Sequence, residues 1–131
     1  MDFFDYTDKS FDKILLDVPC SGTGTINKNP DIKIRRHVKD FIYFRNLQLK
    51  FLEKASNLLK KGGHIVYSTC SLCENENWSL IKSFLNTNNS FKIVNAKKYI
   101  NHKYVDKMGA LNINPYIHKL DGMFAVRLEL K

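Results

Sequence analysis

The sequence predicts an α/β domain built around a mostly parallel sheet. Three apolar segments of strand length, at about residues 12–17, 64–69 and 91–95, alternate with two segments of helical periodicity. Alternation of this kind is typical of α/β sheets, in which each helix returns the chain across one face. A fourth segment, at about 123–130, alternates apolar and polar residues as a half-buried strand does. The 131 residues suffice for one domain.

The first strand gives way to a loop of small residues and then to a long helix. Residues 12–17 contain the apolar run Ile14–Leu16, which predicts a strand buried on both faces of the sheet. From about residue 39 to residue 60, apolar residues recur at three- and four-residue steps, which predicts an amphipathic helix. The glycine pair at 62–63 follows, and we expect it to form the left-handed cap of that helix.

The second strand leads into a polar stretch and a second helix. The strand at 64–69 is followed by Glu74–Asn77, and we expect the helix to begin there. The apolar residues that share one face of this helix are Trp78, Ile81 and Leu85. The strand at 91–95 comes next, whereas residues 96–120 show no sustained period.

Two cysteines stand just past the ends of two predicted strands. Cys20 lies within Pro19–Ser21 after the first strand, and Cys70 lies within Thr69–Ser71 after the second. Ligand sites of parallel α/β sheets lie beyond the carboxyl ends of the strands. We therefore expect both thiols at one edge of the sheet.

Three interpretations of these cysteines remain open on the residues alone. Cysteine is often a small buried hydrophobe, and this interpretation suits Cys73. Residues 70–73 also form a C-x-x-C pattern, as in redox proteins, whereas a zinc site lacks a second ligand pair. The third interpretation is nucleophilic catalysis by Cys70, helped by a helix N-terminus just after it, with Asp17 hydrogen-bonding a substrate nitrogen.

The net charge, the lengths of the apolar runs and the cysteine count indicate which partners and which cellular compartment suit the chain. The net charge is +8, from 21 Lys and Arg against 13 Asp and Glu, which suits a polyanion such as RNA. An AT-rich coding sequence would produce the same bias, so the charge alone does not decide. No apolar run approaches the roughly 20 residues of a membrane span. Three cysteines without a secretion signal favour free thiols and a cytoplasmic location.

Several motifs occur in a fixed order between Asp12 and Leu128: LLDVPCSGTG, NPDIK, LLKKGGHIVYSTCSL, ENEN and DGMFAVRL. Together they resemble the RNA cytosine-carbon-5 methyltransferases of the Nop/Sun group, nearest the bacterial Sun, or ribosomal RNA methyltransferase B, type. The resemblance implies the carboxy-terminal half of a Rossmann-like S-adenosylmethionine-dependent methyltransferase fold. In that fold the last strand inserts antiparallel between the previous two.

The resemblance also implies roles for individual residues. Cys70 would attack carbon 6 of a cytosine in RNA, most often 16S ribosomal RNA, and Cys20 would help to release the covalent adduct. Asp17 would contact the base and the cofactor, S-adenosylmethionine. The target base must leave its stack before a thiol can reach it. The residues expected to contact the RNA are Pro19 and Ser21, with Lys28, Lys33, Arg35 and Arg36 of the following loop. No metal is expected.

The sequence departs from the family pattern in three places. The family commonly has Pro-Glu-Glu-Asn where this chain has Glu74–Asn77, and Asp-Gly-Phe-Phe where it has Asp121–Phe124. The glycine-rich cofactor loop and an amino-terminal RNA-binding domain do not occur, so residues 1–131 are expected to be a partial catalytic domain. We therefore expect weak cofactor binding and an unpaired edge at the strand 12–17, which a missing amino-terminal half or a second copy would cover. The alternative is a non-catalytic remnant or RNA-binding fragment.

Overall fold

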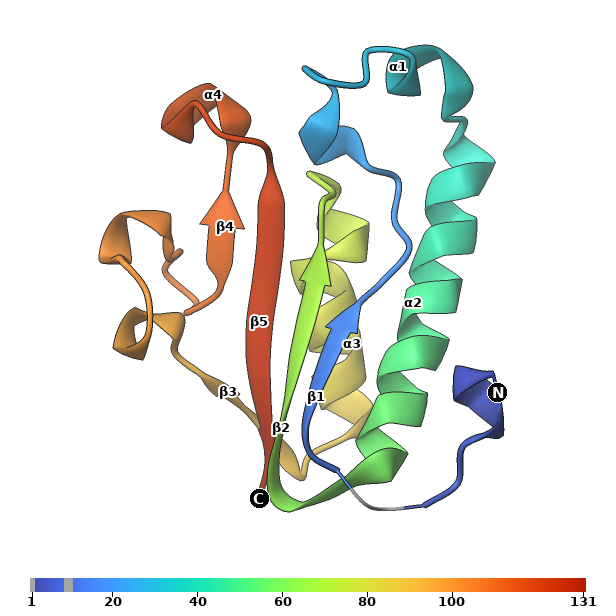
Figure 1. Ribbon diagram of the computed structural model, residues 1–131, viewed down its shortest axis with the longest axis vertical. Coiled ribbons are helices and arrows are strands. Elements are labelled where there is room, and N and C mark those ends of the chain that lie inside the picture. The colour runs from blue at the N-terminus through green and yellow to red at the C-terminus, as the bar shows by residue number, and fades with distance from the viewer. Residues whose placement is uncertain (1, 9–10) are drawn as a thin grey trace.

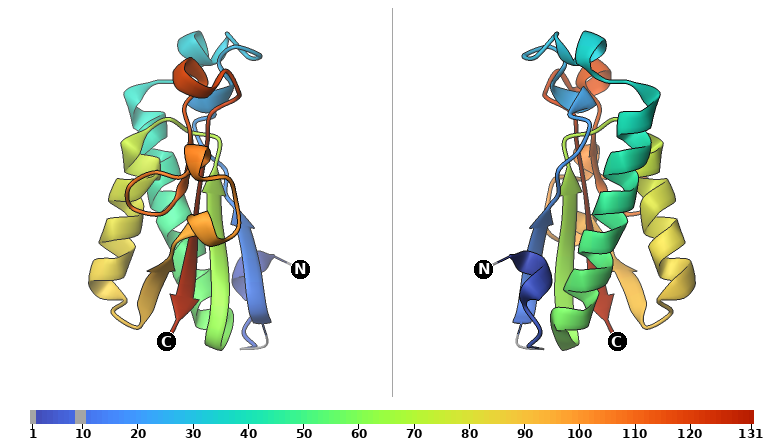
Figure 2. Two further views of the ribbon diagram at one scale, coloured as in Figure 1. Left: turned by 90° about the vertical axis from the view of Figure 1, so that its left-hand side faces the viewer. Right: turned by 90° about the vertical axis from the view of Figure 1, so that its right-hand side faces the viewer.

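The computed structural model, which describes residues 2–8 and 11–131, contains a five-stranded sheet and two long helices. The strands are β1 (Phe11–Asp17), β2 (Leu59–Thr69), β3 (Phe91–Val94), β4 (Leu111–Ile113) and β5 (Met123–Leu130). The helices are α1 (Ile32–Arg35), α2 (Val38–Leu58), α3 (Trp78–Thr87) and α4 (Pro115–His118). The sheet order is β1-β2-β5-β3, with β4 beside β5 (Figure 1). The two long helices lie on the same side of the sheet (Figure 2).

The last strand lies inside the sheet. β5 pairs antiparallel with β2, from His64↔Glu129 to Thr69↔Phe124, and antiparallel with β3 on its other side. β1 and β2 pair in parallel. This arrangement confirms the α/β fold with an antiparallel strand inserted between the second and third strands. The short strand β4 lies in the segment that shows no sustained period, because three residues are too few to establish one.

The core fills the space between the helices and one face of the sheet. Alternate residues of β5, Phe124, Val126 and Leu128, are at most 1% exposed, as the alternation predicted. The Trp78 ring of α3 meets the Phe124 ring edge-on, with 5.4 Å between centroids. In the described part of the chain, no helix is both long and apolar enough to cross a membrane.

The first strand is buried on one face only, so the prediction of burial on both faces is wrong. Leu16, which faces the helices, is 7% exposed, whereas its neighbour Leu15 is 74% exposed. Among the described residues β1 pairs with β2 alone, and the face of the sheet away from α2 and α3 carries no helix there. Leu15 is therefore exposed by the architecture despite its apolar side chain.

The glycine pair lies within β2, so its predicted role as a helix cap is also wrong. Helix α2 ends at Leu58, and Leu59 is already extended. Gly62 has φ of 77° at an irregularity where the pairing with β1 jumps from Phe11↔Leu59 to Lys13↔His64. A left-handed glycine accommodates extra residues in one strand without steric cost. Here the glycines shape a bulge at the start of β2.

Candidate active site at the carboxyl ends of β1 and β2

Cys20 and Cys70 lie together beyond the carboxyl ends of β1 and β2. Their sulfurs are 3.1 Å apart, although 50 residues separate them in the sequence. Asp17↔Ser68 is the last pair of the parallel ladder, and Val18 N donates to Ser68 O at 3.2 Å, so the chains leave the sheet side by side. The structure thus places both thiols at one edge, as expected from two parallel strands. We call residues 18–24 the Pro-Cys loop and residues 70–73 the Thr-Cys loop.

The contact between the sulfurs separates the pKa values of the two thiols. The hydrogen bond from Cys20 lowers the pKa of Cys70 to about 7, against opposing contributions from burial and from the charges of Asp17 and Glu76. The same bond to Cys70, followed by burial, strongly raises the pKa of Cys20. Cys70 therefore holds the thiolate and Cys20 the proton, which makes Cys70 the more nucleophilic sulfur at neutral pH.

The helix N-terminus that was expected just after Cys70 is not there. Cys70 is followed by the Thr-Cys loop, then by a 3₁₀ turn at Glu74–Glu76, and α3 begins only at Trp78. The hydrogen bond with the Cys20 sulfur is the largest cause of the lowered pKa of Cys70, and a backbone hydrogen bond also contributes. Sequence periodicity placed the helix start a few residues too early, because the polar stretch that precedes α3 forms its own turn.

Glu76 joins the two cysteine loops and α2. Its carboxylate is fully buried and accepts hydrogen bonds from Ser21 N (2.9 Å), Ser21 Oγ (2.6 Å), Ser71 Oγ (2.5 Å) and Gln48 Nε2 (2.9 Å). A buried carboxylate is costly unless such bonds replace its water, and bonds to a charged acceptor are the stronger ones. Gln48 Nε2 also donates to Pro19 O at 2.8 Å. Sequence reasoning assigned Glu76 no role; the ENEN motif was the available signal.

A further group of buried bonds fixes the backbone around Cys70. Thr69 Oγ1 donates to Asn77 Oδ1 at 2.6 Å, and Asn77 Nδ2 donates to Ser71 O at 2.8 Å. Tyr67 OH donates to Glu76 O at 2.7 Å, and burial raises the pKa of this phenol. Because these groups have little or no contact with solvent, each lost bond would leave a partner unsatisfied. Buried hydrogen bonds of the neighbouring residues therefore fix the position of the Cys70 backbone.

Two glycines bring a third segment to the same edge. Gly24 N donates to Cys70 O at 2.8 Å, and Gly122 N donates to Gly24 O at 2.8 Å. A Cβ atom on Gly24 would lie 2.5 Å from Gly122 O and 2.7 Å from Cys70 O, so a larger residue would force backbone apart. The Pro-Cys loop, the Thr-Cys loop and the turn before β5 are thus in direct backbone contact.

The predicted contact residues nearest the thiols differ in exposure. Asp17 is exposed at the end of β1 and accepts a hydrogen bond from Ser68 Oγ at 2.9 Å. Pro19 is exposed beside Cys20. Ser21 is fully buried, and its side chain holds Glu76 instead of facing solvent. Asp17 and Pro19 remain accessible to a substrate, whereas Ser21 contributes by positioning its loop.

Two of the four basic residues predicted to contact RNA already have partners in this chain. Arg36 Nε donates to Ser21 O at 2.9 Å, and its guanidinium lies 5.0 Å from the centroid of the Phe44 ring. Arg35 Nε is 3.0 Å from Asp31 Oδ2, one helical turn earlier in α1. Arg36 therefore supports the Pro-Cys loop, and Arg35 is partly neutralised.

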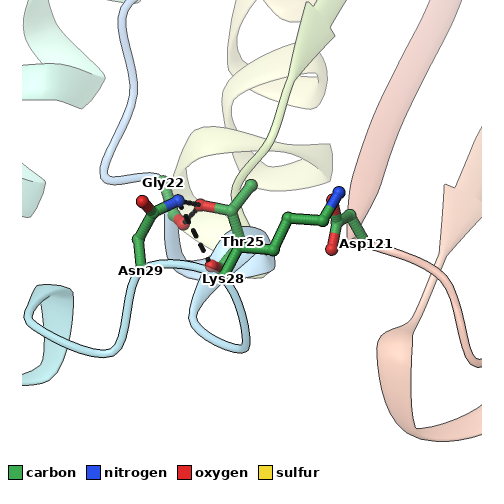
Figure 3. Close-up of polar contacts among 5 residues, drawn as sticks. All are labelled: Gly22, Thr25, Lys28, Asn29 and Asp121. Carbon is green, nitrogen blue, oxygen red and sulfur yellow. Dashed lines mark hydrogen bonds and ion pairs between the residues drawn. The ribbon is translucent and has the colours of Figure 1, made fainter.

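The other two basic residues, Lys28 and Lys33, are both exposed and differ in their ion pairing. Lys28 extends across the edge of the sheet to Asp121, with 2.5 Å between Nζ and Oδ2 (Figure 3). The turn that carries it is closed by Thr25 Oγ1, which donates to Gly22 O at 2.8 Å. Lys33 has no ion pair within the described residues. Of the four cations, Lys33 is the one whose charge is fully available to a polyanion.

The described residues do not form a cradle for S-adenosylmethionine. Their glycine-rich turn, Gly22–Gly24, uses the Gly24 amide to bind Cys70 O and has no room beside Gly24. Asp17 is the candidate cofactor contact that this chain itself provides. Within residues 2–8 and 11–131, no group of three or more His, Cys, Asp or Glu residues could hold a metal ion.

Comparison with known proteins agrees with this geometry. The family model for 16S rRNA methyltransferase RsmB/F matches residues 2–129. Ribosomal RNA small subunit methyltransferase B of Photorhabdus laumondii is 38% identical over 120 residues, which cover 92% of this chain but 26% of that relative. The crystal structure of PH0851 superimposes with a TM-score of 0.85 at 36% identity, covering 93% of this chain and 27% of the other.

A second solved structure connects the fold to a bound small molecule. NSun6 from Pyrococcus horikoshii with SFG matches with a TM-score of 0.80 at 28% identity, and covers 99% of this chain and 33% of that one. A methyltransferase family and this neighbour indicate a cofactor of the S-adenosylmethionine type. The motif order, the inserted strand and the thiol pair lead to one conclusion: the chain belongs to the RsmB/F family of 16S rRNA methyltransferases.

Proposed function

We propose that this chain carries the nucleophile and the release group for methylation of carbon 5 of cytosine in 16S ribosomal RNA. The observation that carries the proposal is the pair of sulfurs, Cys20 and Cys70, 3.1 Å apart at the carboxyl edge of the sheet. Family membership supports the reaction class, and the net charge of +8 supports a polyanionic substrate. Because the chain spans 26% of the Photorhabdus laumondii relative, the rest of the catalytic unit must come from additional sequence.

The first chemical step belongs to Cys70. Its thiolate adds to carbon 6 of a flipped-out cytosine, so that a sulfur–carbon bond forms and the electron pair of the 5,6 double bond moves toward carbon 5. Asp17, exposed beside the thiols, would stabilise the base in its protonated form. When bound, S-adenosylmethionine supplies the methyl group that carbon 5 receives.

The second step belongs to Cys20. The adduct decays when carbon 5 loses its proton and the bond from carbon 6 to the Cys70 sulfur breaks. In the resting pair, the hydrogen bond to Cys70 and its charge raise the pKa of Cys20. Attack consumes that thiolate, so the pKa of Cys20 falls toward its ordinary value only after the adduct has formed. Cys20 can then lose its own proton to solvent and act as the thiolate base that takes the proton from carbon 5, which orders the two steps.

The C-x-x-C redox interpretation has less support. The close pair of sulfurs is Cys20 with Cys70, and the backbone N–H of Cys73 instead donates to Ser71 Oγ at 2.9 Å. A non-catalytic remnant or RNA-binding fragment would retain the same geometry, so that alternative has to be separated by activity. In either case the missing half, or a second copy, would cover the β1 edge, and the free thiols suit the cytoplasm.

The deciding experiment uses a chimera in which this chain replaces the matching segment of the Photorhabdus laumondii enzyme. Cys70→Ala should abolish methyl transfer and leave no covalent species. Cys20→Ala should allow attack but block release, so that a protein–RNA adduct survives denaturing electrophoresis. Cys73→Ala is the matched control and should retain activity.

The possible results separate the interpretations. An adduct from Cys70→Ala and none from Cys20→Ala would reverse the two roles. If the chimera is inactive while the unmodified Photorhabdus laumondii enzyme is active, the interpretation as a non-catalytic remnant is favoured. Joint failure of Cys70→Ala and Cys73→Ala, with Cys20→Ala intact, would support the redox interpretation.

A further inference from the structure

A cavity of about 860 Å³ lies beside the thiols, between the Pro-Cys loop and α4. Its walls come from the turn that follows Cys20, from Leu72 of the Thr-Cys loop, and from the segment that runs through α4 to the start of β5. Figure 1 shows these segments at the same end of the sheet. Nothing in the two-step chemistry of Cys70 and Cys20 uses this cavity.

The cavity adjoins the two loops that carry the thiols, and its lining includes residues of both loops. Leu72 N donates to Thr23 Oγ1 at 2.8 Å, and Gly24 N donates to Cys70 O at 2.8 Å, and Leu72, Thr23 and Gly24 line the cavity. It lies toward β5, whereas the candidate cofactor contact, Asp17, ends the strand at the other side of β2. An RNA strand whose target base reaches Cys70 would therefore carry a neighbouring nucleotide past this cavity.

The lining combines an exposed aromatic ring with a cation. Tyr116 of α4 is 86% exposed, and Lys119 Nζ lies 5.4 Å from the centroid of its ring. Lys28, which also lines the cavity, is paired with Asp121, so Lys119 leaves the lining with a net positive charge (Figure 3). Proteins bind single-stranded nucleic acid by stacking bases on aromatic side chains and by placing cations along the backbone.

The position of Lys119 has a backbone cost that its neighbours do not have. Its φ is 57°, which makes it the one non-glycine residue with positive φ among those described. A β-carbon is unfavourable in this region, where glycine is not. A lysine in this place is thus opposed by backbone preference. Substituting Lys119 by glycine removes the charge beside Tyr116 and also relieves the backbone strain, so the substitution separates the two effects.

We propose that this cavity binds the nucleotide next to the target cytosine, with its base stacked on Tyr116 and its phosphate near Lys119. Asn27, whose side-chain amide has no hydrogen-bond partner within the described residues, lines the same cavity and is available to the edge of that base. This inference rests on the proposed function, because it requires RNA at the thiol site. It adds a subsite that selects the neighbour of the target base.

The test measures binding of single-stranded RNA to the chimera by fluorescence anisotropy. Tyr116→Ala should weaken binding about tenfold, whereas Tyr116→Phe, which keeps the ring, should change it less than twofold. Tyr43→Ala is the matched control, because Tyr43 is 63% exposed on α2 and lies outside the cavity lining. Its affinity should equal that of the parent.

A second probe is RNA in which one nucleotide beside the target lacks its base. In the parent chimera, removing the base at one of the two flanking positions should weaken RNA binding about tenfold. In Tyr116→Ala, removing the same base should hardly change the affinity. Lys119→Gly should weaken binding and flatten its salt dependence by about one phosphate, with an unchanged or higher melting temperature. A lysine with only a structural role would leave the salt dependence unchanged.

The outcomes separate this inference from the proposed function. The subsite is overturned and the function stands if Cys20→Ala still traps an adduct but Tyr116→Ala binds RNA like the parent. The same holds if Cys20→Ala traps an adduct and the losses of affinity from Tyr116→Ala and from the missing base are fully additive. If the parent neither binds RNA nor forms an adduct, both are overturned. An intact adduct together with the predicted coupling to the missing base establishes the subsite.

Discussion

The region around the two thiols, at the carboxyl ends of β1 and β2, is rich in buried hydrogen bonds, whereas the outer strand β1 exposes apolar surface. Around Cys20 and Cys70, buried polar side chains are joined by many hydrogen bonds, of which Glu76 alone accepts four, and Gln48 Oε1 is the buried atom of this network that lacks a partner among the described residues. At β1, an apolar side chain, Leu15, is 74% exposed on a strand that pairs on one side among the described residues. The difference indicates that the described residues by themselves position the two sulfurs, whereas the apolar surface at β1 stays exposed in the single chain.

The largest effect is expected from removing the carboxylate that joins the loops. Glu76→Ala would leave Ser21, Ser71 and Gln48 with unsatisfied buried donors, and should lower the free energy of unfolding by roughly 3 kcal/mol or more. Urea unfolding measures the loss. Glu74→Ala, an exposed glutamate of the same turn, should change stability by less than about 0.5 kcal/mol. Equal, small effects would mean that the carboxylate does not hold the loops together.

A smaller effect is expected at the glycine that brings the loops into backbone contact. Gly24→Ala must displace Gly122 O or Cys70 O, and should cost about 2–3 kcal/mol while it disturbs the thiol pair. Gly62→Ala is the control, because it has open space but a positive φ, and should cost only about 1–2 kcal/mol. Thermal unfolding ranks the two. Activity of the chimera should fall for Gly24→Ala and not for Gly62→Ala.

The sequence predicted the long, periodic elements, because their patterns report which face is buried. The two helices and four of the five strands were found in this way, and the inserted position of β5 followed from the family resemblance. β4 and α4 span three and four residues, too few for a period. The cavity beside α4 was therefore invisible to sequence analysis.

The site was predicted in part, because motifs identify reactive residues better than they identify supporting ones. Cys20 and Cys70 came from strand ends that lie side by side. Glu76 was missed, since a glutamate in a polar run before a helix has the pattern of a solvated turn, and only the tertiary structure shows that it is buried. The partners of Lys28 and Arg36 were equally hidden, because composition counts charges but does not pair them.

A chemical prediction tests the electrostatics of the thiol edge. With a pKa of about 7, Cys70 should be largely thiolate above pH 7 and largely thiol below it, so its alkylation by iodoacetamide should rise through that pH. Cys20→Ala removes the hydrogen bond that lowers this pKa, so the midpoint should move to higher pH. Mass spectrometry of the Cys70 peptide, with Cys73 as internal reference, follows the reaction. An unmoved midpoint would assign the low pKa to another group.

The smallest effect on stability is expected for Leu15 of β1, which forms a matched pair with its neighbour Leu16. Leu16→Ala should cost about 2–3 kcal/mol, because its side chain is 7% exposed and packs in the core. Leu15→Ala should cost close to nothing in a monomer, since its side chain is 74% exposed and its removal opens no cavity. Urea unfolding at two protein concentrations, with sedimentation equilibrium, distinguishes the states. A cost above about 1 kcal/mol for Leu15→Ala that grows with protein concentration would show that a second copy covers this face in solution. In that case the exposed edge would itself be an interface, and the contrast between the two edges would hold only for the single chain.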